Sequence, residues 1–259
     1  MSFGDVVSSN IVGYQTQTPT HSYYDISAAN FIPVSGAKVI RLGDIKPNDE
    51  IISSYITFVT QTGATPSTDF KGTSVKEKYV YWFAADLGPG QEEGWYLEDD
   101  GDCEICKNDV EIPFGDGFMF FKDGGDGAVS LTFSGAVASE PTTKSFSHSY
   151  YSISGNCSPV DITLGDITPN DEIISSYITF VTQTGATPTT SFKGGTVKEK
   201  YVYWFEADLE PGKAPGWYLE DDADCEECKN DVVIKAGQGF LFFKDVGDGD
   251  VTITIPSAL

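Results

Sequence analysis

Basic residues are scarce in this sequence: 16 Lys and Arg stand against 39 Asp and Glu, which gives a net charge of −23. A field of that sign repels the phosphate backbone of nucleic acids and the anionic surface of membranes. We therefore expect no nucleic-acid partner and no membrane insertion. We expect attraction for divalent cations, with Ca²⁺ as the candidate cofactor. The plainer interpretation is that the charge keeps the protein soluble.

Long apolar runs are also missing. No run approaches the roughly 18 residues that a membrane-spanning helix needs. Residues 1–7, MSFGDVV, lack the basic and apolar regions of a secretory signal. Either the protein is cytosolic or the sequence is a mature form without its signal. The many Thr, Ser, Gly and Tyr, the few Lys and the two Met favour the second, so we expect an extracellular or cell-surface location.

Catalytic signatures are absent from the sequence as well. The two histidines, His21 and His148, begin identical His-Ser-Tyr-Tyr segments, and no nucleophile elbow, phosphate loop or zinc-protease motif occurs. Paired carboxylates are plentiful, but in a chain this acidic they discriminate nothing. We expect a protein that is not an enzyme.

An internal repeat is the strongest feature that is present. Residues 43–134 align without a gap on residues 165–256, and 69 of the 92 positions (75%) are identical. The apolar fraction of 40% is ample for two folded units. We expect an N-terminal strand segment (1–20), a first β module (21–138), a short polar linker (139–147) and a second β module (148–259).

Strand periodicity runs through each copy. Val129, Leu131 and Phe133 alternate with hydroxylated residues, and residues 78–83 and 117–121 are dense in aromatic and β-branched side chains. Residues 51–59 also fit a helix, but their β-branched residues favour a strand. No helical pattern exceeds three turns. The predicted fold class is all-β, with two tandem homologous antiparallel β-sandwich or barrel-like modules.

Several short motifs suggest a relationship. They are Ser8-Ser9-Asn10-Ile11-Val12-Gly13-Tyr14, Gly94-Trp95-Tyr96, Asn108-Asp109-Val110 and Gly115-Asp116-Gly117-Phe118. Together they resemble a group of uncharacterised exported β-rich repeat proteins of environmental bacteria, over most of the chain. The resemblance implies export and carries over no catalytic or binding residue.

Two C-x-x-C motifs, Cys103 with Cys106 and Cys225 with Cys228, admit three interpretations. A redox pair is disfavoured because the surrounding carboxylates raise thiol pKa values. A Cys₄ zinc site would need the two loops to meet, since each offers two thiols and no neighbouring His. We favour a local disulfide in each motif. Cys157 has no counterpart; we expect it to be buried, with pairing between chains as the alternative.

Acidic loops precede both cysteine motifs. Four carboxylates within five residues supply oxygens of the kind that Ca²⁺ prefers, although the EF-hand spacing is absent. The candidate ligands are Glu98, Asp99, Asp100 and Asp102, and Glu220, Asp221, Asp222 and Asp224. The alternative is a solvated acidic face. Trp95 and Trp217 lie beside these loops and are predicted to be exposed enough to stack on sugar rings, whereas most other aromatic residues must be core.

The two ends of the chain suggest self-assembly. Residues 135–139 continue past the last strand of the first module, the second module lacks that continuation, and residues 4–8 resemble it. We predict that residues 3–14 pack on the second module of a neighbouring chain, giving a head-to-tail oligomer. The contact would use Phe3, Val6, Val7, Ile11, Val12 and Tyr14. The alternative is a strand that pairs within its own module.

The function that these features favour is a structural or adhesive surface protein, the subunit of a filament or layer. The alternative is a carbohydrate-binding adhesin that recognises glycans at one Ca²⁺-assisted site per module.

Overall fold

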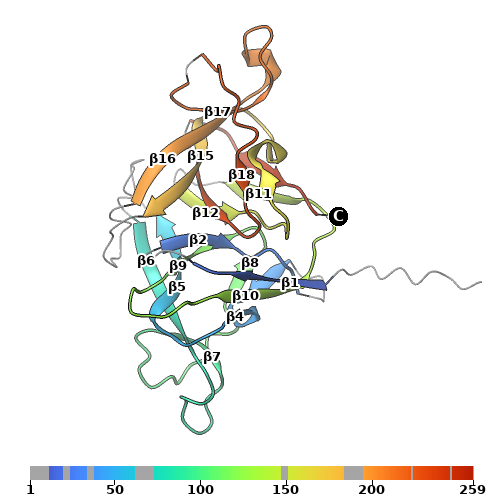
Figure 1. The fold of residues 1–259 in the computed structure, drawn as a ribbon. Helices are drawn as coiled ribbons and strands as arrows, with labels where there is room; N and C mark the ends of the chain where they lie inside the picture. Colours follow the sequence, from blue (N-terminus) through green and yellow to red (C-terminus); the bar gives the residue numbers. More distant parts are fainter. Residues whose placement is uncertain are drawn as a thin grey trace, which may run out of the picture.

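The computed structural model describes residues 12–19, 24–33, 38–61, 73–146, 151–183, 195–222, 224–245 and 247–258. In this part of the chain, every regular element is a β-strand except three single-turn 3₁₀ helices (Figure 1), so the predicted all-β class is confirmed. None of these helical turns is long and apolar enough to cross a membrane.

The first half of the chain contains ten strands among its described residues. They are β1 (Val12–Gln17), β2 (Tyr24–Ala28), β3 (Val39–Arg41), β4 (Ile45–Pro47), β5 (Ile51–Gln61), β6 (Thr73–Trp82), β7 (Gly94–Leu97), β8 (Glu111–Pro113), β9 (Gly117–Phe121) and β10 (Leu131–Ala136), with the helical turn η1 (Leu42–Asp44) before β4.

The described part of the second half repeats this series. Its strands are β11 (Thr142–Phe146), β12 (Tyr151–Gly155), β13 (Ile162–Thr163), β14 (Thr168–Pro169), β15 (Ile173–Gln183), β16 (Gly195–Trp204), β17 (Gly216–Leu219), β18 (Val233–Ile234), β19 (Gly239–Phe243) and β20 (Val251–Ile255), with turns η2 (Leu164–Asp166) and η3 (Glu206–Asp208).

The sheets of the two halves have the same strand order. A five-stranded antiparallel sheet, β2-β9-β5-β6-β7, accompanies a three-stranded sheet, β1-β10-β4, and a β3-β8 pair. The second half has β12-β19-β15-β16-β17, β11-β20-β14 and β13-β18 in the same relation. Phe118 and Phe120 of the larger sheet pack with Leu131 and Phe133 of the smaller one in one buried core, as in a β-sandwich.

Two predicted segment boundaries differ from the structure. β1 pairs with β10, from Val12 opposite Ala136 to Gln17 opposite Leu131, so the N-terminal strand belongs to the first sandwich. Residues 142–146, which we expected in a linker, form β11 and pair with β20. β1 and β11 are therefore equivalent strands. From here, module 1 means β1–β10 and module 2 means β11–β20.

Side chains alternate between the two faces of the sheet along β6. Tyr79 and Tyr81 face the sandwich core, while Val80 and Trp82 belong to a second apolar cluster. That cluster also contains Met119, so both faces of the five-stranded sheet are covered. Residues 51–61 form the strand that the β-branched residues favoured.

The two modules dock through the same surface of each. β2 and β12 lie side by side at the centre of the molecule (Figure 1). Ser27 bridges to Gln238, and Asp116 bridges to Ser154. Ser27 and Ser154 occupy equivalent positions in the repeat, as do Asp116 and Gln238, so each contact occurs twice with the modules exchanged. The seam is thus isologous, with a pseudo-twofold axis between the modules.

Glycine makes this close approach of the modules possible. A methyl group on Gly117 would lie 2.4 Å from Cγ2 of Ile153, and one on the equivalent Gly239 would lie 2.4 Å from Cγ2 of Ile26. Both distances are far below van der Waals contact, so a larger residue would separate the modules.

Candidate functional site

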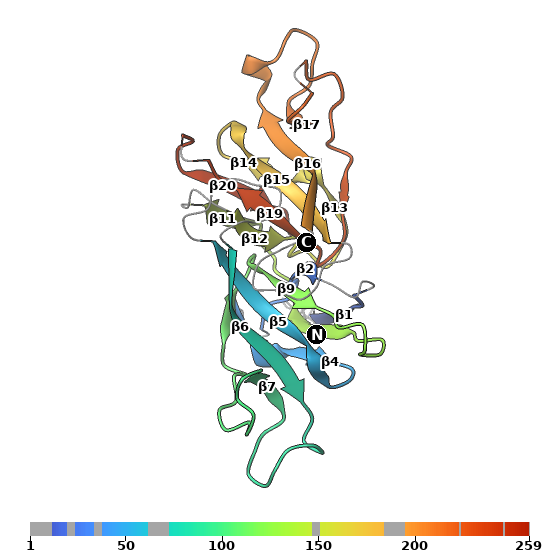
Figure 2. The ribbon, with the colours of Figure 1, turned by 90° about the vertical axis from the view of Figure 1, so that its left-hand side faces the viewer.

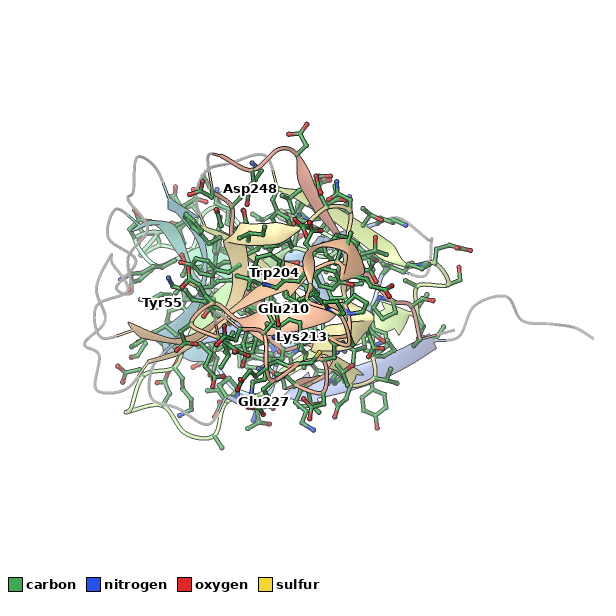
Figure 3. The ribbon with its side chains drawn as sticks, turned by 90° about the horizontal axis from the view of Figure 1, so that it is seen from above. Tyr55, Trp204, Glu210, Lys213, Glu227 and Asp248 are labelled. Carbon is green, nitrogen blue, oxygen red and sulfur yellow. The ribbon has the colours of Figure 1, made fainter. Side chains whose placement is uncertain are left out.

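The loops that follow β7 and β17 contain most of the residues that the sequence singles out. We call residues 98–109 and 220–231 the end loops, because they lie at opposite ends of the elongated molecule (Figure 2). The pseudo-twofold seam produces this placement, since it points equivalent parts of the two modules in opposite directions. In Figure 3, the module 2 end is viewed along the long axis, with Glu210, Lys213 and Glu227 labelled.

The prediction that Trp95 and Trp217 stack on sugars is wrong. Both side chains are completely buried in the sandwich cores. Each indole N–H donates to a backbone carbonyl: Trp95 to Ile45 at 3.0 Å, and Trp217 to Ile167 at 3.1 Å. They are core residues that join the two sheets of each sandwich.

Half of the predicted Ca²⁺ ligands have structural partners. The Asp100 carboxylate accepts the backbone N–H groups of Glu104 and Ile105 at 3.2 and 3.0 Å, and Asp222 accepts those of Glu226 and Glu227 at 3.1 and 3.0 Å. These bonds hold the turn that carries each cysteine pair. For Asp222 they lower the pKa of the carboxyl below its usual value.

Glu98 and Glu220 pair with lysines of the neighbouring strands. The Lys78 Nζ atom lies 2.8 Å from the Glu98 carboxylate and 4.9 Å from the centre of the Tyr55 ring. The equivalent Lys200 lies 2.7 Å from Glu220. These lysines anchor each end loop to its five-stranded sheet.

The remaining predicted ligands, Asp99, Asp102, Asp221 and Asp224, are exposed. Across the described ranges, no three carboxylate, imidazole or thiol groups converge in a way that could hold a metal ion. Ca²⁺ binding by the carboxylates of one loop alone therefore has no preformed geometry, and Ca²⁺ stays a prediction.

All five cysteines are free thiols in the structure, so the local disulfides that we favoured are not formed in it. Cys103 and Cys225 have φ values of +49° and +46°, the two left-handed non-glycine residues among those described. Burial raises the pKa of both thiols, and the nearby Asp100 and Asp222 raise it further. This environment disfavours a reactive thiolate.

A Cys₄ zinc site within one chain is excluded by the placement of the end loops. The two C-x-x-C motifs lie at opposite ends of the molecule (Figure 2), so their thiols cannot share one ion. Cys157 is buried at 3% exposure, as expected, and burial raises the pKa of its thiol.

Where the structure describes the N-terminal segment, it forms a strand of its own module, and the predicted contact with a neighbouring chain stays a prediction. Val12 and Tyr14 pair with β10 of their own module, which is the alternative considered from the sequence. Their side chains are 60% and 79% exposed. Phe3, Val6, Val7 and Ile11 lie outside the described residues.

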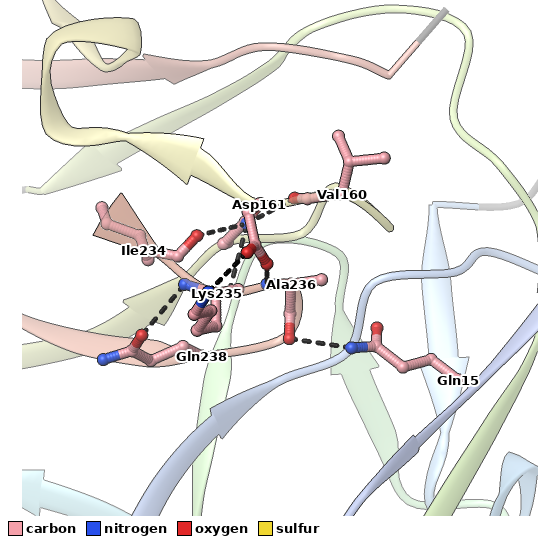
Figure 4. Close-up of polar contacts among 8 residues, drawn as sticks. Gln15, Val160, Asp161, Ile234, Lys235, Ala236 and Gln238 are labelled. Carbon is pink, nitrogen blue, oxygen red and sulfur yellow. Dashed lines mark hydrogen bonds and ion pairs between the residues drawn. The ribbon is translucent and has the colours of Figure 1, made fainter. Parts of the chain in front are cut away.

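The seam between the modules contains a polar network that the sequence did not reveal (Figure 4). The Asp161 carboxylate accepts from Lys235 Nζ at 2.7 Å and from the backbone N–H of Ala236 at 3.0 Å, and Lys235 lowers the pKa of this carboxyl. Gln15 of module 1 donates to the Ala236 carbonyl of module 2 at 3.0 Å. Gln238 Oε1 accepts the Lys235 N–H at 3.0 Å.

One signal in the sequence points to this network. The two copies differ at residues 111, 113, 114 and 116 against residues 233, 235, 236 and 238, in a repeat that is 75% identical overall. Divergence at a surface where the copies meet indicates a place where the two halves are not interchangeable.

Comparisons with protein-family models, with curated proteins and with solved structures found no match to the chain. The resemblance to exported β-rich repeat proteins therefore stays a prediction.

Proposed function

We propose that this chain is a non-catalytic structural protein of the extracellular surface, which joins end to end through its two end loops. The observation that carries this proposal is the pseudo-twofold seam, which presents nearly the same acidic loop at both ends of one molecule (Figure 2). A molecule with two like ends is bivalent, and bivalent units form linear assemblies or cross-links.

The seam itself cannot be the repeating contact between chains. Both bridges, Ser27 with Gln238 and Asp116 with Ser154, are satisfied within one molecule. An isologous contact closes on itself, and here both copies of its surface are used. Assembly therefore requires another surface, and the end loops are the equivalent surfaces that point outward.

A divalent cation supplies the attraction between end loops. The exposed Asp99 and Asp102 of one loop, and Asp221 and Asp224 of the other, repel their counterparts on a second molecule. Neither loop alone gathers a complete ligand set, but two loops that face each other double the number of carboxylates. Ca²⁺ accepts six to eight oxygen ligands in flexible geometry, which suits a shared site of this kind.

Light scattering on the full chain tests the proposal. We expect the mass of the particles to grow beyond a dimer when CaCl₂ is added at millimolar concentration, and EDTA to reverse the growth. NaCl at equal ionic strength should have no such effect, because screening alone supplies no bridge. The variant D99N/D102N/D221N/D224N should stay monomeric. A wild-type protein that stays monomeric in Ca²⁺, or a variant that assembles equally well, contradicts the proposal.

The rival function is a carbohydrate-binding adhesin with one site in each module. Its predicted stacking residues, Trp95 and Trp217, are buried, so this form of the adhesin has no binding surface at those positions.

A further inference from the structure

A cleft of about 380 Å³ opens at the seam between the modules, on one side of the pseudo-twofold axis. This volume lies at the lower end of the range of small-molecule sites, about 300–1,000 Å³. Its lining comes from the end of β1 and from β2 in module 1, and from the turn before β19 in module 2. The lining residues are Gln17, Thr18, Pro19, Asp25, Ile26, Ser27, Lys235, Ala236, Gly237 and Gln238.

An ion pair spans the equivalent place on the other side of the axis, which we call the closed side. Lys144 of β11 bonds to Asp116, which precedes β9. Strand register makes Lys144 the counterpart of Gln17: Gln17 is opposite Leu131, and Lys144 is opposite Ile253, the equivalent residue. Asp116 is likewise the counterpart of Gln238. Where one side has a charged pair across the seam, the other has two neutral amides.

At two further pairs of equivalent positions, the side chain near the cleft is the smaller one. Phe146 of β11 is buried and stacks on Phe242 at 4.0 Å between ring centres, whereas the equivalent residue in module 1 is Pro19. Phe114 is buried at 7% exposure, and its counterpart is Ala236. Smaller side chains on one side leave unfilled volume in an otherwise closely packed seam.

The polar groups of the cleft are held in place by hydrogen bonds. Gln17 Nε2 donates to the carbonyls of Gly237 and Ala28 at 3.2 and 3.3 Å. Gln238 is fixed by the Lys235 N–H, and Lys235 by Asp161, as Figure 4 shows. A cleft whose side chains are already ordered loses little conformational entropy when a ligand binds.

The chemistry of the lining selects a neutral, hydroxyl-rich ligand. Amides and hydroxyls, among them Gln17, Ser27 and Gln238, both donate and accept hydrogen bonds. The charge of Lys235 is balanced by Asp161 at 2.7 Å. The Asp25 carboxylate also lines the cleft, and with the net charge of −23 it disfavours anions. Ile26 supplies an apolar patch of the kind that contacts the C–H face of a sugar ring. We propose that this cleft binds a neutral mono- or disaccharide unit.

This inference does not depend on the proposed end-to-end assembly, because the cleft lies at the seam and not at the ends. Binding is therefore measured in EDTA, where the chains do not assemble. The probes are glucose, galactose, mannose, cellobiose, maltose and lactose, by saturation-transfer-difference NMR and calorimetry on the full chain. We expect at least one of them to bind with a Kd of about 1 mM or below.

The chain itself supplies the design of the variants. Q17K/Q238D places the ion pair of the closed side into the cleft and should raise Kd at least about tenfold. The matched control D116Q/K144Q alters only the closed side and should leave the affinity of the cleft unchanged. Should Q17K/Q238D fail to fold, A236F, which copies Phe114, takes its place with the same expected loss.

The proposal is overturned if no probe binds at about 10 mM, a concentration well above the expected Kd. It is also overturned if the folded cleft variant binds as tightly as the wild type, or if D116Q/K144Q loses binding to the same extent.

Discussion

At the scale of single residues, the paired tryptophans show how a large side chain joins the sheets of each module. Trp95 lies edge-on to Tyr81 at 5.2 Å, and its N–H reaches across to the smaller sheet at Ile45. Trp217 and Ile167 repeat the arrangement in module 2. The indole thus contributes both apolar burial and a hydrogen bond to a backbone carbonyl of the facing sheet.

Replacing Trp95 with Phe should therefore be costly. The change leaves the Ile45 carbonyl without its donor and removes part of a completely buried ring, so we expect a loss of about 2–3 kcal/mol in the free energy of unfolding. Urea denaturation measures this directly. The control is Trp82→Phe, at a half-buried position, for which we expect about 1 kcal/mol or less. Equal costs for the two variants would contradict the role of Trp95.

A carboxyl pair in each module gives stability an unusual dependence on pH. A hydrogen bond with Asp86, and then burial, raise the pKa of Glu50; burial, and then a hydrogen bond with Asp208, raise that of Glu172. A raised pKa means that the folded state binds more protons than the unfolded state just above the usual Glu pKa. Stability therefore falls as pH rises through that window.

The variant E50Q/E172Q should remove this penalty. We expect its Tm to exceed that of the wild type by roughly 1–3 °C at pH 7. The difference should shrink as pH is lowered toward 4, where the wild-type carboxyls are protonated. Thermal melts at both pH values, with the exposed Glu140→Gln as control, decide this. If the variant is less stable than the wild type at pH 7, ionised Glu50 and Glu172 do not lower the stability of the folded state.

Individual residues differed in how far the sequence could predict them. The alternation of Tyr79 and Tyr81 against Val80 and Trp82 was predictable, because strand period 2 fixes the side of each residue. The burial of Trp95 was not, because it depends on a carbonyl 50 residues away in another sheet. The shared position of Gln17 and Gln238 in the cleft was not predictable either, because only the fold brings these distant residues together across the seam.

At the scale of elements, each end loop contains a turn that carries two cysteines. One aspartate, Asp100 or Asp222, holds this turn by accepting backbone N–H groups. Cys103 and Cys225 are buried, while Cys106 and Cys228 are half-buried. Gln91 donates to the Cys103 carbonyl at 3.2 Å, which fastens the turn in module 1 to the preceding loop. The left-handed φ at the first cysteine of both loops shows that this conformation is a reproducible feature of the motif.

Alkylation should follow this geometry. Without reductant, iodoacetamide in urea should add to all five thiols. In the native state Cys106 and Cys228 should react first, because the other three thiols are buried. Native reaction of Cys103 and Cys225 should speed up from pH 7 to 9, since their raised pKa keeps them protonated at neutral pH. Intact-mass spectrometry counts the adducts. Four thiols that resist alkylation until reduced would show that the disulfides form after all.

The strands themselves were more predictable than their partners. Residues 51–61, 117–121 and 251–255 are strands, as their side-chain pattern indicates. β11 escaped prediction because Thr142–Phe146 follows a polar, proline-containing stretch typical of a linker. Its strand character comes from pairing with β20, and such tertiary pairing leaves little trace in a five-residue segment.

At the scale of the whole molecule, the repeat and the seam together determine how the two modules are placed. The repeat predicts two similar modules but not their relation, because translation and twofold rotation are equally compatible with a duplicated sequence. The seam selects the twofold relation, with Gly117 and Gly239 allowing close contact. That choice turns two copies of an acidic loop into two opposed ends, and it is the basis of the proposed end-to-end assembly.

A variant with one altered end tests this account most directly. D99N/D102N changes only the module 1 end, so each molecule retains one competent end. In Ca²⁺, light scattering should show polymers for the wild type and for the control E140Q/D250N, which removes two carboxylates outside the end loops. The D99N/D102N protein should stop at the dimer, because two single ends can join only once. Long polymers of D99N/D102N, indistinguishable from wild type, would contradict the account.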